Sequence, residues 1–348
     1  MEFGLTRFST NPAVRRPAAT QRRQQATSVS PWVGPGLRTG RVCATLLIIT
    51  TVLLSGCRSL PERSVAERRG EEFVAAGRFF PADTRIVTWL DAGGYDAYAR
   101  KTGAPQNHEK RQALQDAKAR TNELPLLQKH VDQLVLHYDN TGLSSLTFGI
   151  LQKRGLSAHF LVDVDGTIYQ TLDLRERAWH ATTSNERSIG VEIAHIGAYP
   201  PAETKTPAKW YARDPAGRVR LQIPPGVREP RILKPDFIGR PDRNEPVHAT
   251  IQDHDLVQYD YTPEQYAALA RLTAALNRVF PKIRLEVPRD AKGAVLSRKL
   301  DDKADENFTG ILGHFHIQEN KVDPGPALQW EKLIQEAREV RGKKGRGF

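Results

Sequence analysis

Short apolar runs that alternate with helical segments most constrain the fold of this chain. Residues 131–137 have the length and composition of a buried strand, and residues 144–154 follow them as a short helix. Two β-branched runs, 158–164 and 167–172, come next, and the Asp-Gly pair between them is typical of a tight hairpin turn. Strands that are interleaved with helices predict an α/β fold with a mixed sheet.

The second half of the chain continues this pattern. Strands are predicted over 188–193 and 310–314, and a closing helix over 328–341. A long amphipathic helix follows Thr262, because this threonine, the next proline and Gln265 can form a capping box. That helix should cover one face of the sheet. We therefore expect a single domain in which helices flank a mixed central β-sheet.

Composition divides the 348 residues into consecutive parts. Residues 1–57 form an N-terminal arm with a signal segment. Residues 58–130 form a tether and an N-terminal helical packing segment, with helical spacing in pieces such as 65–75. The main domain spans 131–341, and 342–348 form a basic tail.

A Pro-rich insertion interrupts the main domain at about 199–258. Ten of the 23 prolines of the chain fall in this stretch. Proline removes a backbone donor and clashes with the preceding helical turn, so this density forbids a long helix. We interpret the stretch as an extended excursion on the surface of the domain.

The two cysteines lie within or directly behind the only long apolar run of the sequence, 42–54. That run is too short to span a membrane comfortably. With Arg38 and Arg41 ahead of it and Leu-Ser-Gly before Cys57, it predicts a bacterial lipoprotein signal whose cleavage leaves Cys57 as a lipid-modified N-terminus. An ordinary cleaved signal or an uncleaved anchor is the alternative.

The positive charge of the chain is concentrated in its N-terminal arm. The sequence has 51 basic and 40 acidic residues, but seven of the arginines and one glutamate precede Cys57. The remainder therefore holds 44 basic and 39 acidic residues, a net charge of +5. Because no basic run with interleaved aromatic side chains occurs, we expect no nucleic-acid partner.

Side chains that can bind metal gather in residues 313–326. His314 and Asp323 carry the nitrogen and oxygen atoms that a catalytic zinc accepts, and Lys321 can hold a positive charge beside such a metal. His316 would share the strand face of His314, so it is a rival ligand. Further ligands must come from elsewhere in the chain.

Two upstream residues lie on predicted strands. His137 ends the first strand, where period-two alternation places Leu134 and Leu136 on the opposite face. Glu192 lies among small residues of strand 188–193, which leaves space for a substrate. It is a candidate general base, and the alternative is a half-buried glutamate paired with a lysine or an arginine.

Six ordered motifs in residues 133–330 carry a resemblance to a known family. They are Leu136-His137, 157–162 with Asp165-Gly166, 177–181, 188–192, Gly313-His314, and 321–326 with Trp330. Together they resemble the zinc-dependent N-acetylmuramoyl-L-alanine amidases of the type 2 family, which are related to peptidoglycan-recognition proteins.

The resemblance implies a role for each candidate. His137, His314 and Asp323 would hold Zn²⁺ and leave a fourth position for water. Glu192 would be the catalytic base and Lys321 the residue that stabilises the transition state. His159, Trp179 and His180 lie in family motifs, and we expect them to line the substrate cleft or to support the ligands without binding metal. The other histidines have no motif support, and we expect them to be solvated or satisfied within the core: His108, His130, His195, His248 and His254.

The implied reaction is hydrolysis of the amide bond between N-acetylmuramic acid and the L-alanine of the stem peptide, in peptidoglycan or muropeptides. With the signal at Cys57, this predicts a lipid-anchored monomer of the cell envelope, and Arg58 favours the outer membrane facing the periplasm. One alternative is a recognition module that binds peptidoglycan without cutting it, although all three ligands are present. Another is a zinc peptidase acting within the stem peptide, although the chain has no HExxH motif.

Overall fold

The computed structural model describes residues 68–99, 103–116, 122–227 and 231–343. All of them belong to one compact unit, Arg58–Phe348. The predicted signal segment with Cys57 lies outside the described residues. No helix among the described residues is long and apolar enough to cross a membrane.

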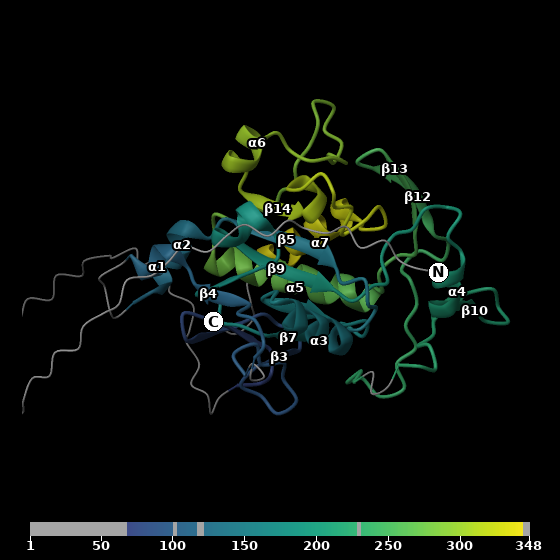
Figure 1. Cartoon of the computed structure of the whole chain (residues 1–348), viewed down its shortest axis with the longest axis horizontal. Coiled ribbons are helices and arrows are strands. Elements are labelled where there is room, and N and C mark those ends of the chain that lie inside the picture. Colours follow the sequence, from purple (N-terminus) through teal and green to yellow (C-terminus); the bar gives the residue numbers. More distant parts are fainter. Residues whose placement is uncertain (1–67, 100–102, 117–121, 228–230, 344–348) are drawn as a thin grey trace, which may run out of the picture. The chain divides into compact units, whose positions relative to one another are not determined.

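A six-stranded mixed β-sheet forms the centre of the domain (Figure 1), which confirms the predicted fold class. The three neighbour pairs from β14 to β6 are parallel, β6 and β7 are antiparallel, and β7 and β3 are parallel. In spatial order the strands are β14 (Gly310–Gly313), β5 (Gln133–Tyr138), β9 (Ser188–Ile193), β6 (Phe160–Val162), β7 (Ile168–Gln170) and β3 (Ile86–Thr88).

Helices cover the two faces of this sheet. One face packs against α5 (Pro263–Val279), which runs beside the strands in Figure 1, and against α7 (Trp330–Gly342). On the other face Phe148 and Leu151 of α3 (Ser144–Arg154) pack against β6 and β7. The strand β5 follows the predicted alternation, since Leu134 and Leu136 join the α5 core while Val135 packs with Leu312 on the opposite face.

The predicted helix signals are confirmed at α5. The Thr262 hydroxyl accepts a hydrogen bond from the Gln265 backbone N–H at 3.1 Å, and the Gln265 side chain accepts one from the Thr262 N–H at 3.0 Å. The helix α3 ends where Gly155 adopts a φ of 65°. In the β6–β7 turn Gly166 has a φ of 79°, and a Cβ atom there would lie 2.6 Å from the Glu264 carbonyl oxygen of α5.

The helical prediction for 65–75 is wrong in its described part. Residues Glu72–Ala75 form β1, which pairs with β2 (Arg78–Pro81) in an antiparallel hairpin. Ala76 and Gly77 both have positive φ values, 52° and 74°, and such a turn closes a two-residue hairpin and forbids a helix. Two short helices do follow in the N-terminal segment, α1 (Gln112–Gln115) and α2 (Leu124–His130).

The described residues of the Pro-rich insertion form no long helix, as predicted. Its one described helix is α4 (Lys205–Trp210), and its strands form two hairpins gathered on one side of the domain in Figure 1. The hairpins pair β10 (Tyr211–Arg213) with β11 (Val219–Leu221), and β12 (Val247–Ile251) with β13 (His254–Gln258).

The remaining elements are short. The strand β4 (His108–Lys110) pairs with β8 (Glu176–Ala178), and α6 (Asp302–Asn307) precedes β14. The predicted strand 310–314 ends one residue early, because His314–His316 form the 3₁₀ turn η3. The closing helix begins at Trp330, two residues later than predicted.

Candidate metal centre and active-site cavity

His137, His314 and Asp323, the three ligands that the family resemblance implies, lie close together. The Nδ1 atoms of the two histidines lie 3.0 Å apart, and Asp323 Oδ2 lies 2.8 Å from His137 Nδ1 and 3.0 Å from His314 Nδ1. All three side chains are buried. Among the described residues this is the one group of three or more His, Cys, Asp or Glu side chains with metal-ligand spacing.

The sheet brings the two histidines together. The strands β14 and β5 are parallel neighbours, and Gly313 pairs with Leu136, so the residues that follow them lie side by side. Asp323 returns to the site because the Phe315 N–H donates to the Asp323 carbonyl at 3.2 Å, which holds the loop against η3.

His316 does not compete for this position. Because β14 ends at Gly313, η3 turns the His316 ring away from the face that carries His314. The Gly313 N–H donates to His316 Nδ1 at 2.9 Å, and His316 Nε2 donates to the Leu296 carbonyl at 2.7 Å. Both ring nitrogens are therefore occupied by the backbone.

The three facing side chains fit a zinc ion. Two imidazoles and one carboxylate are a donor set of catalytic zinc, and with bonds of about 2.0–2.1 Å a tetrahedral ion separates its ligand atoms by roughly 3.3 Å. The observed separations of 2.8–3.0 Å need only a small opening to reach that value.

The protonation states of these groups also suit a metal. Burial, reinforced by His314, lowers the pKa of His137 to about 4, so its ring is neutral at pH 7, as a ligand must be. Burial alone would raise the pKa of Asp323, but His314 and the hydrogen bonds from both histidines hold it below its ordinary value. The aspartate therefore supplies a carboxylate anion.

A hollow of about 160 Å³ opens above these ligands. Glu192 lines it beside His137, because the two residues pair across the parallel strands β9 and β5. Burial and then the charge of Asp323 raise the pKa of Glu192 well above its ordinary value, while Lys321 and Arg154 lower it.

Lys321 lines the same cavity on a fixed backbone. Gln252, in the turn between β12 and β13, donates its side-chain amide to the Lys321 carbonyl at 2.6 Å and to the Gln318 carbonyl at 2.7 Å. The Lys321 N–H in turn donates to Gln318 at 3.2 Å. The insertion thus anchors the loop that carries the lysine.

Two of the three further motif residues line the cavity, and the third lies outside it. Trp179 and His180 line the cavity. His180 Nδ1 lies 3.0 Å from His137 Nε2, the ring atom that faces away from the other ligands, and His180 Nε2 lies 3.2 Å from the Ser188 hydroxyl. His159 is fully buried outside the cavity, where its Nδ1 accepts from the Gly190 N–H at 3.1 Å.

Two residues that line the cavity were not predicted from the sequence. Arg154 ends α3 and Asn140 follows β5, and both contribute to the wall of the cavity. Neither belongs to a motif that the sequence singled out. The feature that the two residues share is their place at the end of α3 and just after β5, in one β5–α3 unit.

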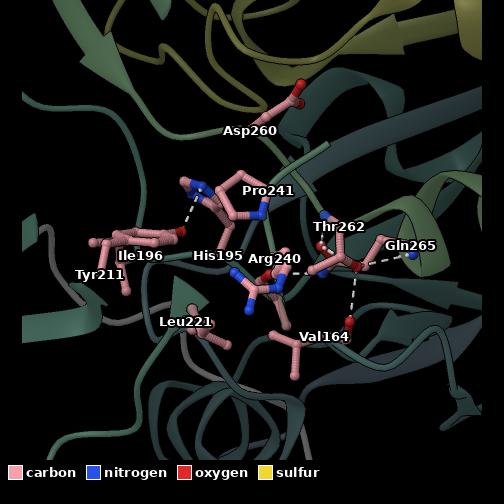
Figure 2. Close-up of a pocket in the computed structure, with 12 residues that line it drawn as sticks. Val164, His195, Ile196, Tyr211, Leu221, Arg240, Pro241, Asp260, Thr262 and Gln265 are labelled. Carbon is pink, nitrogen blue, oxygen red and sulfur yellow. Dashed lines mark hydrogen bonds between the residues drawn. The ribbon is translucent and has the colours of Figure 1, made fainter. Parts of the chain in front are cut away.

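The remaining histidines have the roles expected of them. His195 is buried beside a small cavity of about 10 Å³ at the base of the insertion, which is too small for a substrate (Figure 2). Its Nδ1 accepts from the Gly197 N–H, and its Nε2 lies 2.9 Å from the Tyr259 carbonyl. His108 bonds the Asn107 side chain, and three others are exposed: His130, His248 and His254.

Comparison with known proteins gives one family match. A family model described as N-acetylmuramoyl-L-alanine amidase matches residues 127–326, more than half of the chain. No curated protein matches the chain.

Several solved structures resemble the chain. A selenomethionine derivative of AmpD is 19% identical, with 71% of this chain and 98% of that chain covered and a TM-score of 0.32. AmiD from E. coli, in complex with anhydro-N-acetylmuramic acid-L-Ala-D-γ-Glu-L-Lys, is 18% identical, with coverages of 64% and 60% and a TM-score of 0.32. The endolysin LysCS from Clostridium intestinale is 13% identical, with coverages of 73% and 95% and a TM-score of 0.34. Because these TM-scores are low, the likeness to solved structures supports no assignment, and only the match to the family model does.

Proposed function

The chain belongs to the N-acetylmuramoyl-L-alanine amidase family, and we propose that it carries out this peptidoglycan amidase activity with a zinc ion held by His137, His314 and Asp323. The substrate bond is the amide between the lactyl group of N-acetylmuramic acid and the L-alanine of the stem peptide. The observation that carries the proposal is the buried His-His-Asp group at the floor of a cavity that also contains Glu192 and Lys321.

The zinc ion and Glu192 have separate roles in the proposed reaction. Zinc, when bound, supplies a Lewis acid that polarises the amide carbonyl and favours ionisation of water. Glu192 takes a proton from the attacking water and passes it to the departing nitrogen of L-alanine. The C–N bond breaks as the C–O bond forms, so the products are the lactyl carboxylate and a stem peptide with a free amine.

Lys321 stabilises the negative charge of the transition state. Lys321 lines the cavity together with the ligands, and its positive charge would stabilise the negative charge that develops on the carbonyl oxygen. A fixed donor of this kind contributes roughly 3 kcal/mol to transition-state stabilisation. Trp179, in the wall of the same cavity, offers a flat apolar face to a sugar ring or to the peptide.

We also propose a location. The apolar run ahead of Cys57 and the Leu-Ser-Gly-Cys sequence support a lipid anchor on Cys57, and Arg58 supports retention in the outer membrane on its periplasmic side. A monomer held there would reach peptidoglycan directly. Labelling of Cys57 by a fatty-acid analogue in cells, lost in Cys57→Ser, would support the anchor.

The activity is tested with muropeptides and mass spectrometry. The protein without residues 1–57 should release intact stem peptide with a free L-alanine amine, and both chelation of the metal and Asp323→Ala should abolish that release. Binding of muropeptides without any cleavage would favour a recognition module. Cleavage between stem-peptide residues would favour a zinc peptidase.

A further inference from the structure

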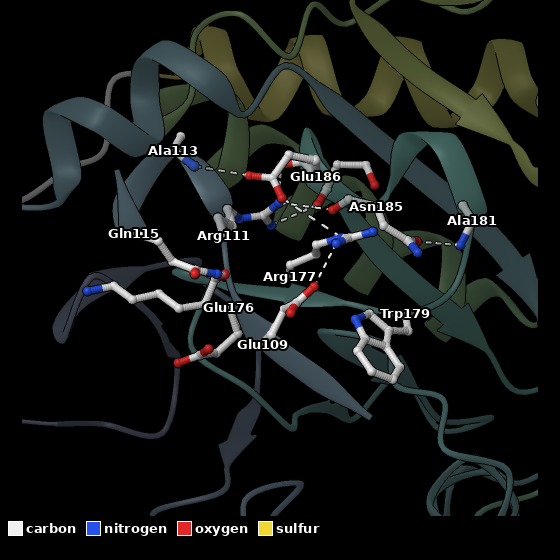
Figure 3. Close-up of polar contacts among 12 residues, drawn as sticks. Glu109, Arg111, Ala113, Gln115, Glu176, Arg177, Trp179, Ala181, Asn185 and Glu186 are labelled. Atoms are coloured by element: carbon white, nitrogen blue, oxygen red, sulfur yellow. Dashed lines mark hydrogen bonds and ion pairs between the residues drawn. The ribbon is translucent and has the colours of Figure 1, made fainter. Parts of the chain in front are cut away.

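Arg111 is a fully buried arginine in the segment ahead of the family-matched residues 127–326. The strand β4 delivers it, because β4 pairs with β8 and the Arg111 N–H donates to the Arg175 carbonyl at 3.3 Å. Figure 3 shows its side chain reaching the turn that contains Asn185 and Glu186. The function proposed above assigns no role to this residue.

The guanidinium of Arg111 is bound by backbone carbonyls. Its Nε donates to Leu174 at 3.0 Å, its Nη1 to Asn185 at 3.1 Å and to Glu186 at 2.7 Å, and its Nη2 to Ser188 at 2.8 Å. Leu174 precedes β8, Asn185 and Glu186 end η2 (Thr182–Glu186), and Ser188 begins β9. Only a planar fork of several donors can bind such a set at once, so lysine is not equivalent here.

The turn held by Arg111 in turn holds His180. The Asn185 side-chain oxygen accepts hydrogen bonds from the backbone N–H groups of His180, at 3.0 Å, and of Ala181, at 2.7 Å. The His180 ring bonds the Ser188 hydroxyl, and Ser188 is itself held through its carbonyl by Arg111. The backbone and the ring of His180 are therefore both fixed through groups that Arg111 binds.

The orientation of His180 matters for a metal ligand. When His137 binds metal through Nδ1, its proton resides on Nε2 and needs an acceptor. His180 Nδ1, at 3.0 Å, is that acceptor, and the opposite nitrogen of His180 then donates to Ser188. A chain of hydrogen bonds with one direction thus runs from the metal ligand to the start of β9.

His159 connects β9 to β8 next to Arg111. Its Nδ1 can only accept from the Gly190 N–H, so its Nε2 carries a proton and donates to the Glu176 carbonyl at 3.0 Å. Arg111 Nη2 lies 3.3 Å from that Nε2. Burial, with the charge of Arg111 adding to it, lowers the pKa of His159 to about 3, so the ring stays neutral and keeps this arrangement.

We infer that Arg111 is a positioning residue of the metal centre, which holds His180 against His137 through Asn185 and Ser188. The N-terminal segment ahead of the family-matched region is therefore a working part of the active site. This inference rests on the proposed zinc site.

A matched pair of arginines tests it. Arg177 lies in the same polar cluster, but its guanidinium faces Glu109 at 2.6 Å and Glu186 at 3.8 Å and binds none of these carbonyls (Figure 3). Zinc affinity of the purified protein is measured by competition with a chromophoric chelator, together with the visible absorption of its Co²⁺ form. Arg111→Gln should weaken zinc binding by roughly 10–100-fold and change the Co²⁺ spectrum. Arg177→Gln should leave both nearly unchanged.

A double-mutant cycle separates positioning from general stability. In a His180→Ala background, Arg111→Gln should have little further effect on zinc affinity, because the contact between His180 and His137 is already lost. Asn185→Ala, which leaves Arg111 in place, should reproduce the loss of zinc affinity and replaces Arg111→Gln if that variant does not fold.

The possible outcomes are distinguishable. If the Arg111 variants lower only the melting temperature of the metal-free protein and keep zinc affinity and the Co²⁺ spectrum, the inference is wrong while the proposed function stands. If their effect adds in full to that of His180→Ala, Arg111 does not act through His180. If the wild-type protein binds no zinc, both the proposed function and this inference fail.

Discussion

Gly190 is the position in β9 at which one added methyl group should most disturb the proposed metal centre. A Cβ atom there would lie 2.7 Å from three atoms of the His180 ring, whereas ordinary van der Waals contact begins at 3.4 Å. The ring has little room to yield, because its nitrogens bond His137 and Ser188 at 3.0 and 3.2 Å. Either the ring or the strand must shift by about 0.7 Å, the difference between these two distances.

A shift of that size is enough to break the contact between His180 and His137. Starting from 3.0 Å, it carries the two nitrogens beyond hydrogen-bond distance. Overpacking of a buried site costs about 1–3 kcal/mol, and the loss of a hydrogen-bond partner of a metal ligand weakens metal binding by about 10–100-fold. We expect Gly190→Ala to show both effects.

Two measurements with one control check this expectation. Urea unfolding in the presence of a chelator gives the stability of the metal-free protein, and chelator competition gives zinc affinity. The control is Gly149→Ala in the exposed part of α3, where a Cβ atom meets nothing within 4 Å. It should raise the free energy of unfolding by about 0.5–1 kcal/mol and leave zinc affinity unchanged. If Gly190→Ala keeps both wild-type stability and wild-type zinc affinity, the packing of His180 does not control the metal centre.

Three further predictions follow from individual side chains. His314→Ala should lose zinc while His316→Ala keeps most of it in a metal-content assay, because both ring nitrogens of His316 bond the backbone; the reverse pattern would transfer the ligand assignment. Glu192→Gln should lower the rate of muropeptide hydrolysis by roughly 10²–10⁴-fold and leave zinc affinity intact, and a variant that hydrolyses muropeptides at the wild-type rate would remove Glu192 as the base. Burial, with the charge of Asp165 adding to it, raises the pKa of Asp163 from 3.8 to about 8, so between those values the folded state holds a proton that the unfolded chain lacks. Stability should therefore fall as pH rises through that window, by up to about 1.4 kcal/mol per pH unit, and urea unfolding of Asp163→Asn should show a flatter dependence unless this carboxyl ionises normally.

The sequence predicts the central elements well, since each carries its own local signal. Ser188–Ile193 and Ser144–Arg154 have the predicted bounds residue for residue, and the capping box of α5 is present. The N-terminal hairpin could not be recognised in this way. A four-residue strand such as β1 is too short for its periodicity to be told from that of a helix, and its pairing depends on the backbone of Ala76 and Gly77.

In the candidate site, too, some residues could be predicted from the sequence and others could not. His137 and His314 each stand in a motif at the end of a predicted strand, so both could be predicted as ligands before their strands were known to be neighbours. Arg111 left no comparable signal, because its partners are backbone carbonyls and a carbonyl has no signature in the sequence. Its place depends on the pairing of β4 with β8, which joins residues nearly seventy positions apart.

The spacing of the parallel strands β14, β5 and β9 sets the spacing of the proposed catalytic groups. His137 lies on β5 and Glu192 on β9, His314 directly follows β14, and neighbouring strands lie about 4.8 Å apart whatever side chains they carry. The spacing of these three residues therefore belongs to the backbone, and one of them can be exchanged for another residue without moving the others. The site depends on strand register. A slip of one residue in β5 would turn His137 toward α5, and the site would lose both a proposed metal ligand and part of the cavity wall.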